Sequence, residues 1–310
     1  MSLKLDRLGW EFINPVLLAS GPAGFGLELA TFFRKRSLGG LTTKTLTREP
    51  RQGNPPPRLV DAPAGALNSI GLANPGLEIF FAEILPQLRE LPTVRVVSFA
   101  APEPGEAEAM AGALGGAAGV DVLELNLSCP NVDGRIPAWD SKATGEMVRA
   151  SAGATHTPLL AKLSPDVPDV VPQGEAALKA GATGLTLVNA VRGLRIKHDT
   201  GLPAFARKWG GLSGGAILPI SLAKVFQARQ AFPGVPIVGV GGVTNLGSLL
   251  EMAMAGADLV GLGLAVMADP ALPWRLVEEL EEWLSCRGIG QYSEVVGCAH
   301  RGGLDVPKPA

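Results

Sequence analysis

The sequence has little cysteine and little histidine for its length. Three residues of each type occur among 310, and the cysteines at 129, 286 and 298 include no C-x-x-C pair. An odd number of widely spaced cysteines predicts neither a disulfide framework nor a cysteine metal site, and it is typical of a protein in a reducing compartment. The histidines are too far apart for the usual metal-ligand spacing, so we expect no metal site.

Long apolar runs are also missing, and so is an excess of charge of either sign. The longest apolar stretches, 14–20 and 258–267, are shorter than the ~20 residues of a membrane-spanning helix, and the first residues lack the apolar core of a secretory signal. The net charge of −2 provides no basic surface for nucleic acid. We therefore expect a cytoplasmic protein without a membrane or nucleic-acid partner.

What the chain does contain is a series of short apolar segments separated by glycine and proline. Eight of them have the composition of buried strands: 16–19, 40–44, 94–99, 122–127, 159–163, 185–189, 237–240 and 259–264. Segments with helical periodicity or composition lie between many of these strands, at 77–91, 106–118, 174–180, 222–231 and 246–255. This alternation predicts an α/β fold, a (β/α)8 TIM barrel forming one domain over 1–310, with an open doubly wound sheet as the alternative.

Two connections that follow predicted strands are unusually long and rich in proline and glycine. They span residues 45–74 and 190–215. Because loops after the strands of a barrel form its active-site face, we expect both insertions to roof the site; the alternative is a pair of surface excursions without a role. Residues 3–12 have the pattern of a small hairpin, which we expect at the bottom of the barrel.

The fourth predicted strand ends in a cluster of polar residues that includes a thiol. Asn126, Ser128, Cys129 and Asn131 follow in quick succession, and Pro130 interrupts them. Proline biases the preceding residue toward an extended conformation, so we expect Cys129 at the C-terminal mouth of the strand. Taken alone, a cysteine is more often a small buried apolar residue than a reactive one.

Glycines and lysines at other strand ends indicate a site for an anionic ligand. Gly241, Gly242 and Gly263 follow the last two strands, where barrels commonly bind phosphate with bare backbone amides and helix N-termini. Lys44 and Lys162 lie in otherwise apolar strands. A buried ammonium needs a negative partner, and we favour an anionic ligand over an internal carboxylate; the alternative is that both lysines reach solvent.

Asparagines gather at strand ends and in the insertions, at positions 68, 126, 131 and 189. Each side chain offers two donors and one acceptor without adding charge. One such residue alone is usually part of a turn. Together they favour a flat ligand with amide NH and C=O edges.

Seven motifs carry a resemblance to a known family. They are N-P-V-L-L-A-S-G at 14–21, G-N-P-P-P-R at 53–58, N-S-I-G-L-A-N-P-G at 68–76, N-L-S-C-P-N-V at 126–132, K-L-S-P at 162–165, G-G-L-S-G at 210–214 and G-V-G-G at 239–242. Over nearly its full length the chain resembles the class 1 dihydroorotate dehydrogenases, which use FMN to oxidise dihydroorotate to orotate in pyrimidine synthesis.

The segments at 71–78 and 297–300 look closer to subclass 1B than to the fumarate-using subclass 1A. Subclass 1B implies an iron–sulfur FAD subunit that passes electrons to NAD, within a homodimer or heterotetramer. The chain itself shows no recognisable NAD motif, because no G-x-G-x-x-G follows its first strand.

The resemblance assigns roles to individual residues. Cys129 is the implied base, taking a proton from C5 of dihydroorotate while hydride leaves C6, and Lys44 lies between flavin and substrate. The implied substrate set is Lys44, Asn68, Ser69, Ile70, Gly71, Leu72, Asn126, Asn131, Asn189 and Ala190. The implied FMN set is Ser20, Lys44, Thr45, Asn126, Lys162, Val188, Gly214, Gly241, Gly242, Gly263 and Leu264.

Three positions depart from the family pattern. Ala190 replaces a Thr or Ser, Ser98-Phe99 replaces Ala-Asn after the third strand, and Leu264 replaces a Thr in the phosphate loop. Each lost hydrogen bond costs about 1 kcal/mol. Two alternatives therefore stay open: a related FMN barrel that acts on another pyrimidine or an enone, and a weakly active or non-catalytic flavin-binding subunit that serves as an assembly partner.

Overall fold

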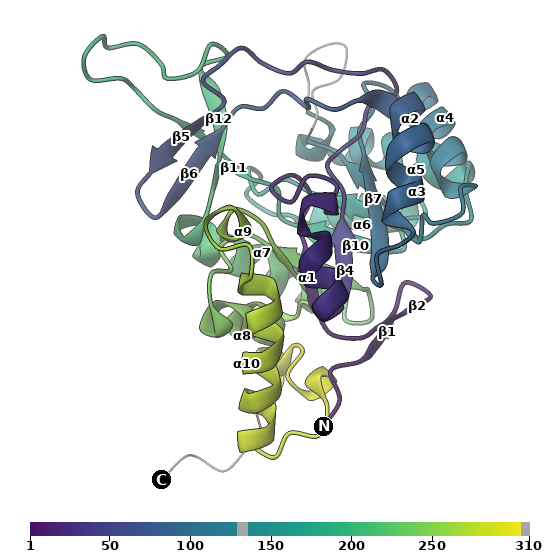
Figure 1. The fold of residues 1–310 in the computed structure, drawn as a ribbon, viewed down its shortest axis with the longest axis vertical. Helices are drawn as coiled ribbons and strands as arrows, with labels where there is room; N and C mark the ends of the chain where they lie inside the picture. Colours follow the sequence, from purple (N-terminus) through teal and green to yellow (C-terminus); the bar gives the residue numbers. More distant parts are fainter. Residues whose placement is uncertain (129–135, 305–310) are drawn as a thin grey trace.

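The centre of the molecule is a closed barrel of eight parallel strands (Figure 1). The structure is a computed structural model that describes residues 1–128 and 136–304. The strands are β3 (Val16–Leu18), β4 (Gly40–Thr42), β7 (Val94–Phe99), β8 (Val122–Asn126), β9 (Leu159–Lys162), β10 (Gly184–Leu187), β13 (Ile237–Val240) and β14 (Leu259–Leu262). They follow one another around the barrel in chain order, and β14 pairs with β3 to close it. The predicted TIM barrel and its eight strands are confirmed.

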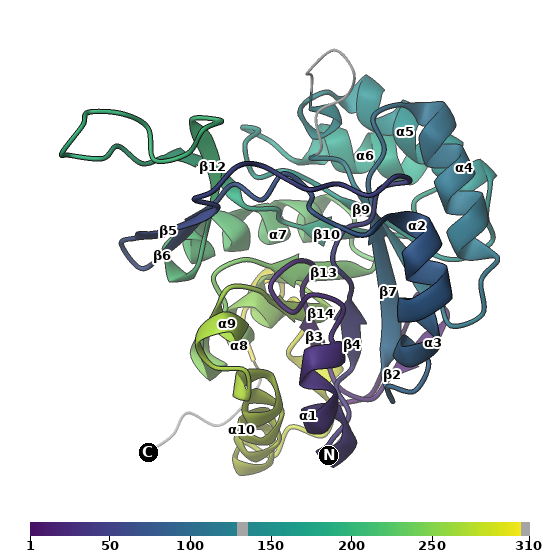
Figure 2. The ribbon, with the colours of Figure 1, turned by 45° about the horizontal axis from the view of Figure 1, so that its top comes forward.

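Helices surround the barrel (Figure 2). They are α1 (Ala30–Lys35), α2 (Gly76–Ile79), α3 (Leu85–Leu88), α4 (Pro104–Gly115), α5 (Ser141–Gly153), α6 (Val171–Lys179), α7 (Leu218–Ala231), α8 (Leu246–Ala255), α9 (Ala265–Ala268) and α10 (Leu272–Cys286). Short 3-10 turns cover Leu27–Leu29, Pro137–Trp139, Gly215–Ile217, Tyr292–Glu294 and Cys298–His300. Among the described residues, no helix is long and apolar enough to cross a membrane.

The helix predicted as one unit at 77–91 is divided. A π-helical turn, Phe80–Ile84, separates α2 from α3. Pro86 lies in the first turn of α3, and because proline has no N–H it cannot donate the hydrogen bond that would continue α2 in register. The helical character predicted for this segment is therefore confirmed from its start to Leu88, but the helix is irregular and ends before residue 91.

Helix α10 shows how the outer layer is held to the barrel. Leu276, Leu280 and Leu284 recur every fourth residue and are fully buried, whereas the glutamates between them face outward. This spacing places an apolar stripe on one side of the helix. The stripe packs α10 against β3.

The two insertions meet in a second, antiparallel sheet. Residues 45–74 supply β5 (Leu59–Ala62) and β6 (Gly65–Asn68), and residues 190–215 supply β11 (Val191–Leu194) and β12 (Trp209–Ser213). The order is β11-β12-β6-β5, with β12 and β6 joining the two insertions. Figure 2 shows this sheet beside the barrel, with the connection between β11 and β12 projecting away from it. The insertions are therefore a single structural unit, here called the roof sheet.

The N-terminal hairpin lies where the sequence predicts it. Strands β1 (Leu5–Arg7) and β2 (Trp10–Phe12) pair antiparallel. The indole Nε1 of Trp10 donates to the carbonyl of Asp121, 2.8 Å away, and Arg7 Nε donates to Asp258 over 2.7 Å. Asp121 and Asp258 directly precede β8 and β14. The hairpin thus closes the N-terminal end of the barrel, opposite the roof sheet.

Candidate active site

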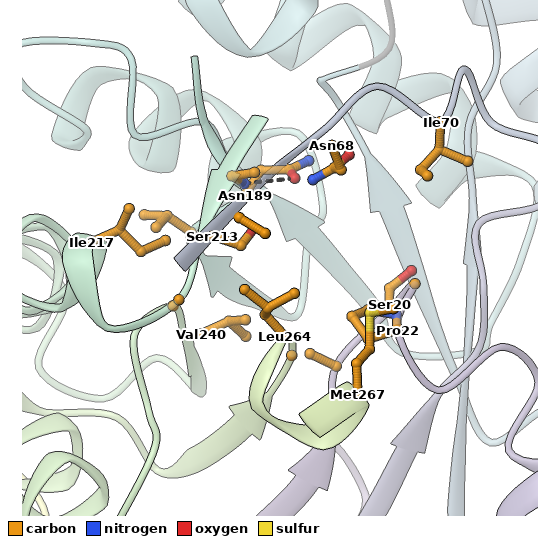
Figure 3. Close-up of a pocket in the computed structure, with 18 of the residues that line it drawn as sticks. Ser20, Pro22, Asn68, Ile70, Asn189, Ser213, Ile217, Val240, Leu264 and Met267 are labelled. Carbon is orange, nitrogen blue, oxygen red and sulfur yellow. Dashed lines mark hydrogen bonds between the residues drawn. The ribbon is translucent and has the colours of Figure 1, made fainter. Parts of the chain in front are cut away.

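A cavity of about 350 Å³ lies between the C-terminal ends of the barrel strands and the roof sheet (Figure 3). Residues that end or follow β3, β4, β8, β9, β10, β13 and β14 line it, and Leu59, Ala66 and Asn68 contribute from the roof sheet. We call this space the barrel cavity. An outer hollow adjoins it, and the two share Asn68, Ile70, Leu72, Asn126, Asn189 and Ala190.

The hydroxyl of Thr45 connects three strands at the edge of the cavity. Its Oγ1 lies 3.2 Å from Ser20 Oγ and 3.0 Å from Ser98 Oγ, and it accepts a hydrogen bond from Asn126 Nδ2 over 3.2 Å. These partners come from the ends of β3, β7 and β8. Thr45 is buried, so water contributes little to this network and the side chains fix one another's positions.

A second group of hydrogen bonds orients the asparagines. Asn189 Nδ2 donates to Asn126 Oδ1 over 3.1 Å, and the N–H of Ala190 donates to Asn189 Oδ1 over 2.8 Å. In the roof sheet, Asn68 Nδ2 donates to the carbonyl of Gly211 over 3.0 Å. Asn68 and Asn189 both face the cavity (Figure 3). The cavity therefore has neutral donors and acceptors held in place on two sides.

Lys44 lies on the cavity wall just after β4. Partial burial lowers the pKa of its ammonium, and the positive charge of Arg58 lowers the pKa further, while Glu28 acts in the opposite direction. Arg58 itself is held by the insertion, since its guanidinium donates to the carbonyls of Asn54 and Gln52. The structure thus places a lysine with a lowered pKa beside the predicted substrate residues.

Lys162 lies deeper, inside the barrel, with 5% of its surface exposed. Its Nζ is 3.6 Å from Oε1 of Glu124, which is 2% exposed. An internal carboxylate, which the sequence analysis disfavoured, therefore faces Lys162, and the alternative of a solvent-facing side chain is wrong for this lysine. Glu124 precedes Asn126 by two residues on β8, and side chains two apart on a strand share a face, so its carboxylate also points into the barrel.

Glycines line the part of the cavity that lies at the ends of β3, β13 and β14. Gly241 and Gly242 turn the chain after β13 with φ values of +114° and +88°, and a Cβ on Gly242 would lie 2.4 Å from Leu218 Cα at the start of α7. By contrast, Gly21 and Gly263 line the cavity, and a Cβ on either would meet nothing within 4 Å. Their missing side chains therefore leave open space on the cavity side.

Every residue of the predicted FMN set lines the barrel cavity. Most of the predicted substrate set lines both the cavity and the outer hollow, while Ser69 and Gly71 line the hollow alone. Cys129 and Asn131 lie outside the described residues. The roles of all these residues remain predictions, but the described members gather at one place.

The three departures from the family pattern differ in consequence. Phe99 is fully buried and lies outside the cavity lining, whereas Ser98 takes part in the Thr45 network. Ala190 and Leu264 do line the cavity. The missing hydroxyls at 190 and 264 therefore remain the relevant changes.

The residues that sequence reasoning missed are charged ones. Glu124 was not singled out, although a carboxylate in the apolar alternation V-L-E-L-N is a signal of an interior charge. Arg58 was quoted within a motif but given no role. Among residues 1–128 and 136–304, no group of three His, Cys, Asp or Glu side chains is placed to hold a metal ion.

Comparisons with known proteins agree with this site. A family model described as dihydroorotate dehydrogenase matches residues 2–284. A relative from Pelobacter propionicus, named dihydroorotate dehydrogenase B (NAD(+)), catalytic subunit, is 40% identical over 297 residues, covering 95% of this chain and 97% of the relative. A relative from Desulforudis audaxviator with the same name is also 40% identical over 297 residues, covering 95% of this chain and 96% of the relative.

A relative from Aquifex aeolicus, named putative dihydroorotate dehydrogenase A (fumarate), is 38% identical over 304 residues, covering 97% of this chain and 99% of the relative. A solved dihydroorotate dehydrogenase from Eimeria tenella, in complex with ferulenol, shares the fold with a TM-score of 0.78 at 22% identity, covering 96% of this chain and 89% of that one. The expected resemblance, nearer to subclass 1B, is confirmed. Since the family model and these relatives match nearly the whole sequence, the chain belongs to the dihydroorotate dehydrogenase family.

Proposed function

We propose that this chain oxidises dihydroorotate to orotate with FMN as its flavin and Cys129 as the base. The observation that carries the proposal is the convergence of the described residues. The predicted FMN set, drawn from strand ends around the barrel, lines one cavity, and most of the predicted substrate residues line both that cavity and the adjoining outer hollow. A flavin beside a substrate needs two adjoining spaces of this kind.

The residues present fit FMN. Gly21 and Gly263 leave open space where a side chain would intrude on a ligand. The bare turn at Gly241 and Gly242 lies against the start of α7, and backbone amides at a helix start favour a phosphate. Lys162 brings a positive charge to the cavity interior, where an electron-rich ring system would be stabilised by it.

The chain's own residues would then perform the binding and the proton transfer. Asn68, Asn126 and Asn189 are held in position to bind the amide edges of the substrate. Cys129, as thiolate, would take the proton from C5. When bound, FMN supplies the acceptor for the hydride that leaves C6. Lys44 adds positive charge to the cavity lining, which would favour an anionic substrate and the thiolate form of Cys129.

The physiological acceptor and the assembly are part of this proposal. The relatives from Pelobacter and Desulforudis are named catalytic subunits of NAD(+) enzymes. We infer an iron–sulfur FAD partner subunit that carries electrons to NAD, in a heterotetramer or beside a homodimer, in the cytoplasm. Co-purification from the native host should recover an iron–sulfur partner, and a chain recovered alone would contradict this inference.

Replacement of Cys129 tests the proposed base. General-base catalysis contributes ~10²–10⁴-fold to a rate, so Cys129→Ala should lower turnover of dihydroorotate with an artificial acceptor by about 100-fold or more. The matched control is Cys286→Ala, because Cys286 is an exposed cysteine on α10 and should leave turnover unchanged. Both proteins should retain flavin absorbance. Full turnover in Cys129→Ala would contradict the assignment.

A further inference from the structure

A buried carboxylate lies at the base of the barrel cavity and has no part in the proposed reaction. Glu124 on β8 is 2% exposed, and its Oε1 has no hydrogen-bond partner among the described residues. Buried carboxylates are almost always hydrogen-bonded, since leaving one without partners is costly. Its surroundings therefore need an explanation.

The counter-charge is Lys162 on the neighbouring strand. Lys162 Nζ lies 3.6 Å from Glu124 Oε1, which is close enough for a strong Coulomb interaction but too long for a hydrogen bond. In the register of β8 and β9, Lys162 lies opposite Asn126, one layer nearer to the cavity than Glu124. Lys162 lines the cavity and Glu124 does not.

The geometry leaves the ammonium available to a ligand. At 3.6 Å the contact with Glu124 Oε1 is an ion pair and not a hydrogen bond, although an ammonium has three donors. The carboxylate therefore attracts the ammonium from the side away from the cavity by charge alone. The N–H donors of the ammonium can then point toward the cavity. A pair of this kind adds little net stability compared with apolar residues of similar size, which favours a role in the site.

We propose that Glu124 is a positioning residue that holds the Lys162 ammonium toward the cavity and offsets its charge, so that the pair sets the reduction potential of the bound flavin. The inference rests on the proposed function, because it needs FMN in this cavity. A flavin that accepted a hydride, which is two electrons and one proton, would carry a negative charge. Lys162 would stabilise that charge and Glu124 would oppose it, and both effects would be strong because the barrel interior excludes water.

The test is the midpoint potential of bound FMN, measured anaerobically against reference dyes. Glu124→Gln keeps the shape and removes the negative charge, so the potential should shift in the positive direction. Lys162→Met removes the positive charge and should shift it in the negative direction. Thr186→Val is the matched control: Thr186 pairs with Lys162 in register and carries a buried hydroxyl without a partner, but no charge, so the potential should stay at the wild-type value.

A merely structural role predicts a different pattern. It would lower thermal stability in Glu124→Gln while leaving the potential unchanged, or shift the potential of both variants in the same direction. Either result overturns the inference. Glu124→Asp keeps the charge on a shorter side chain and should bring the potential back toward wild type, even if the glutamine variant folds poorly. Wild-type protein that binds no FMN overturns the proposed function together with the inference, whereas FMN binding without opposite shifts overturns the inference alone.

Discussion

The hydroxyl of Thr45 has three hydrogen-bond partners in the site. It contacts Ser20, Ser98 and Asn126, each across a different strand end. Valine has the same shape as threonine but cannot accept or donate a hydrogen bond. The hydroxyl, rather than the bulk of the side chain, is therefore what aligns these groups.

Thr45→Val should weaken both folding and cofactor binding. Buried groups left without a partner cost ~1–3 kcal/mol, so we expect a loss of that order in the free energy of unfolding and about a tenfold higher Kd for FMN. Denaturant titration and flavin fluorescence would measure the two effects. Thr186→Val, which removes a buried hydroxyl that has no partner, should have the smaller effect, and equal effects would contradict the role of the network.

Arg58 should control the charge of Lys44. Burial and Arg58 both lower the pKa of Lys44, so Arg58→Met should raise that pKa toward the ordinary value. The neutral amine is the reactive form, and the pH at which Lys44 is half-labelled by an acylating reagent should therefore move upward. Arg58→Lys keeps the positive charge and should leave the midpoint nearly unchanged. An identical shift in both variants would show that Arg58 acts through loop geometry instead.

At this scale, sequence reasoning works when a residue type is unusual for its position. A lysine in an apolar strand and a series of asparagines at strand ends are visible without coordinates, and the described members do line the cavity. The carboxylate beside Lys162 was not predicted, because pairing across strands depends on register. Glu124 and Lys162 meet only once β8 and β9 are aligned.

Among the elements, the roof sheet is one that the sequence alone does not reveal. Its strands come from segments rich in glycine and proline, where strand patterns are weak, and β6 pairs with β12, where the register partners Asn68 and Gly211 are 143 residues apart in the chain. The barrel strands, by contrast, are short apolar runs buried on both sides, and such runs are typical of parallel sheets. Local composition therefore predicted the barrel, while the pairing of the insertions depends on long-range contacts.

Gly65→Ala should separate the two halves of the roof sheet. A Cβ at Gly65 would lie 2.0 Å from the carbonyl oxygen of Ser213 on β12, and overpacking of this kind costs ~1–3 kcal/mol. We expect faster hydrogen exchange of the β6 and β12 amides and weaker orotate binding. Gly105→Ala in the first turn of α4, where a Cβ meets nothing within 4 Å, is the control. Unchanged exchange in Gly65→Ala would show that the sheet accommodates the methyl group.

Across the whole molecule, the hairpin and the barrel are joined at one buried carboxylate. Asp258, just before β14, accepts hydrogen bonds from Arg7 of the hairpin over 2.7 Å and from Arg229 of α7 over 2.6 Å. It also accepts one from the N–H of Ile237 in β13 over 2.9 Å. The sequence predicted the hairpin and its place at the barrel bottom but not this contact, because Arg7 and Asp258 lie 251 residues apart in the chain.

Asp258→Asn should destabilise the entire fold. Removing one partner from a buried ion pair costs ~3–5 kcal/mol, and here two guanidinium groups lose their counter-charge. Urea unfolding should report a loss of that order in the free energy of unfolding. Asp269→Asn removes a carboxylate from an exposed pair with Arg275 and should change stability far less. A loss no greater than that of the Asp269 variant would contradict the tie between hairpin and barrel.

The visible absorbance of bound flavin, recorded while dihydroorotate is added without oxygen, tests the proposed function most directly. Dihydroorotate in the cavity beside bound FMN would give up two electrons to the flavin, so the yellow colour should bleach at about one equivalent of dihydroorotate, and orotate should form in equal amount. Other dihydropyrimidines and enones, offered in the same way, should bleach the flavin far less. A flavin that stays oxidised in the presence of dihydroorotate, or that another substrate bleaches faster, would contradict the proposal.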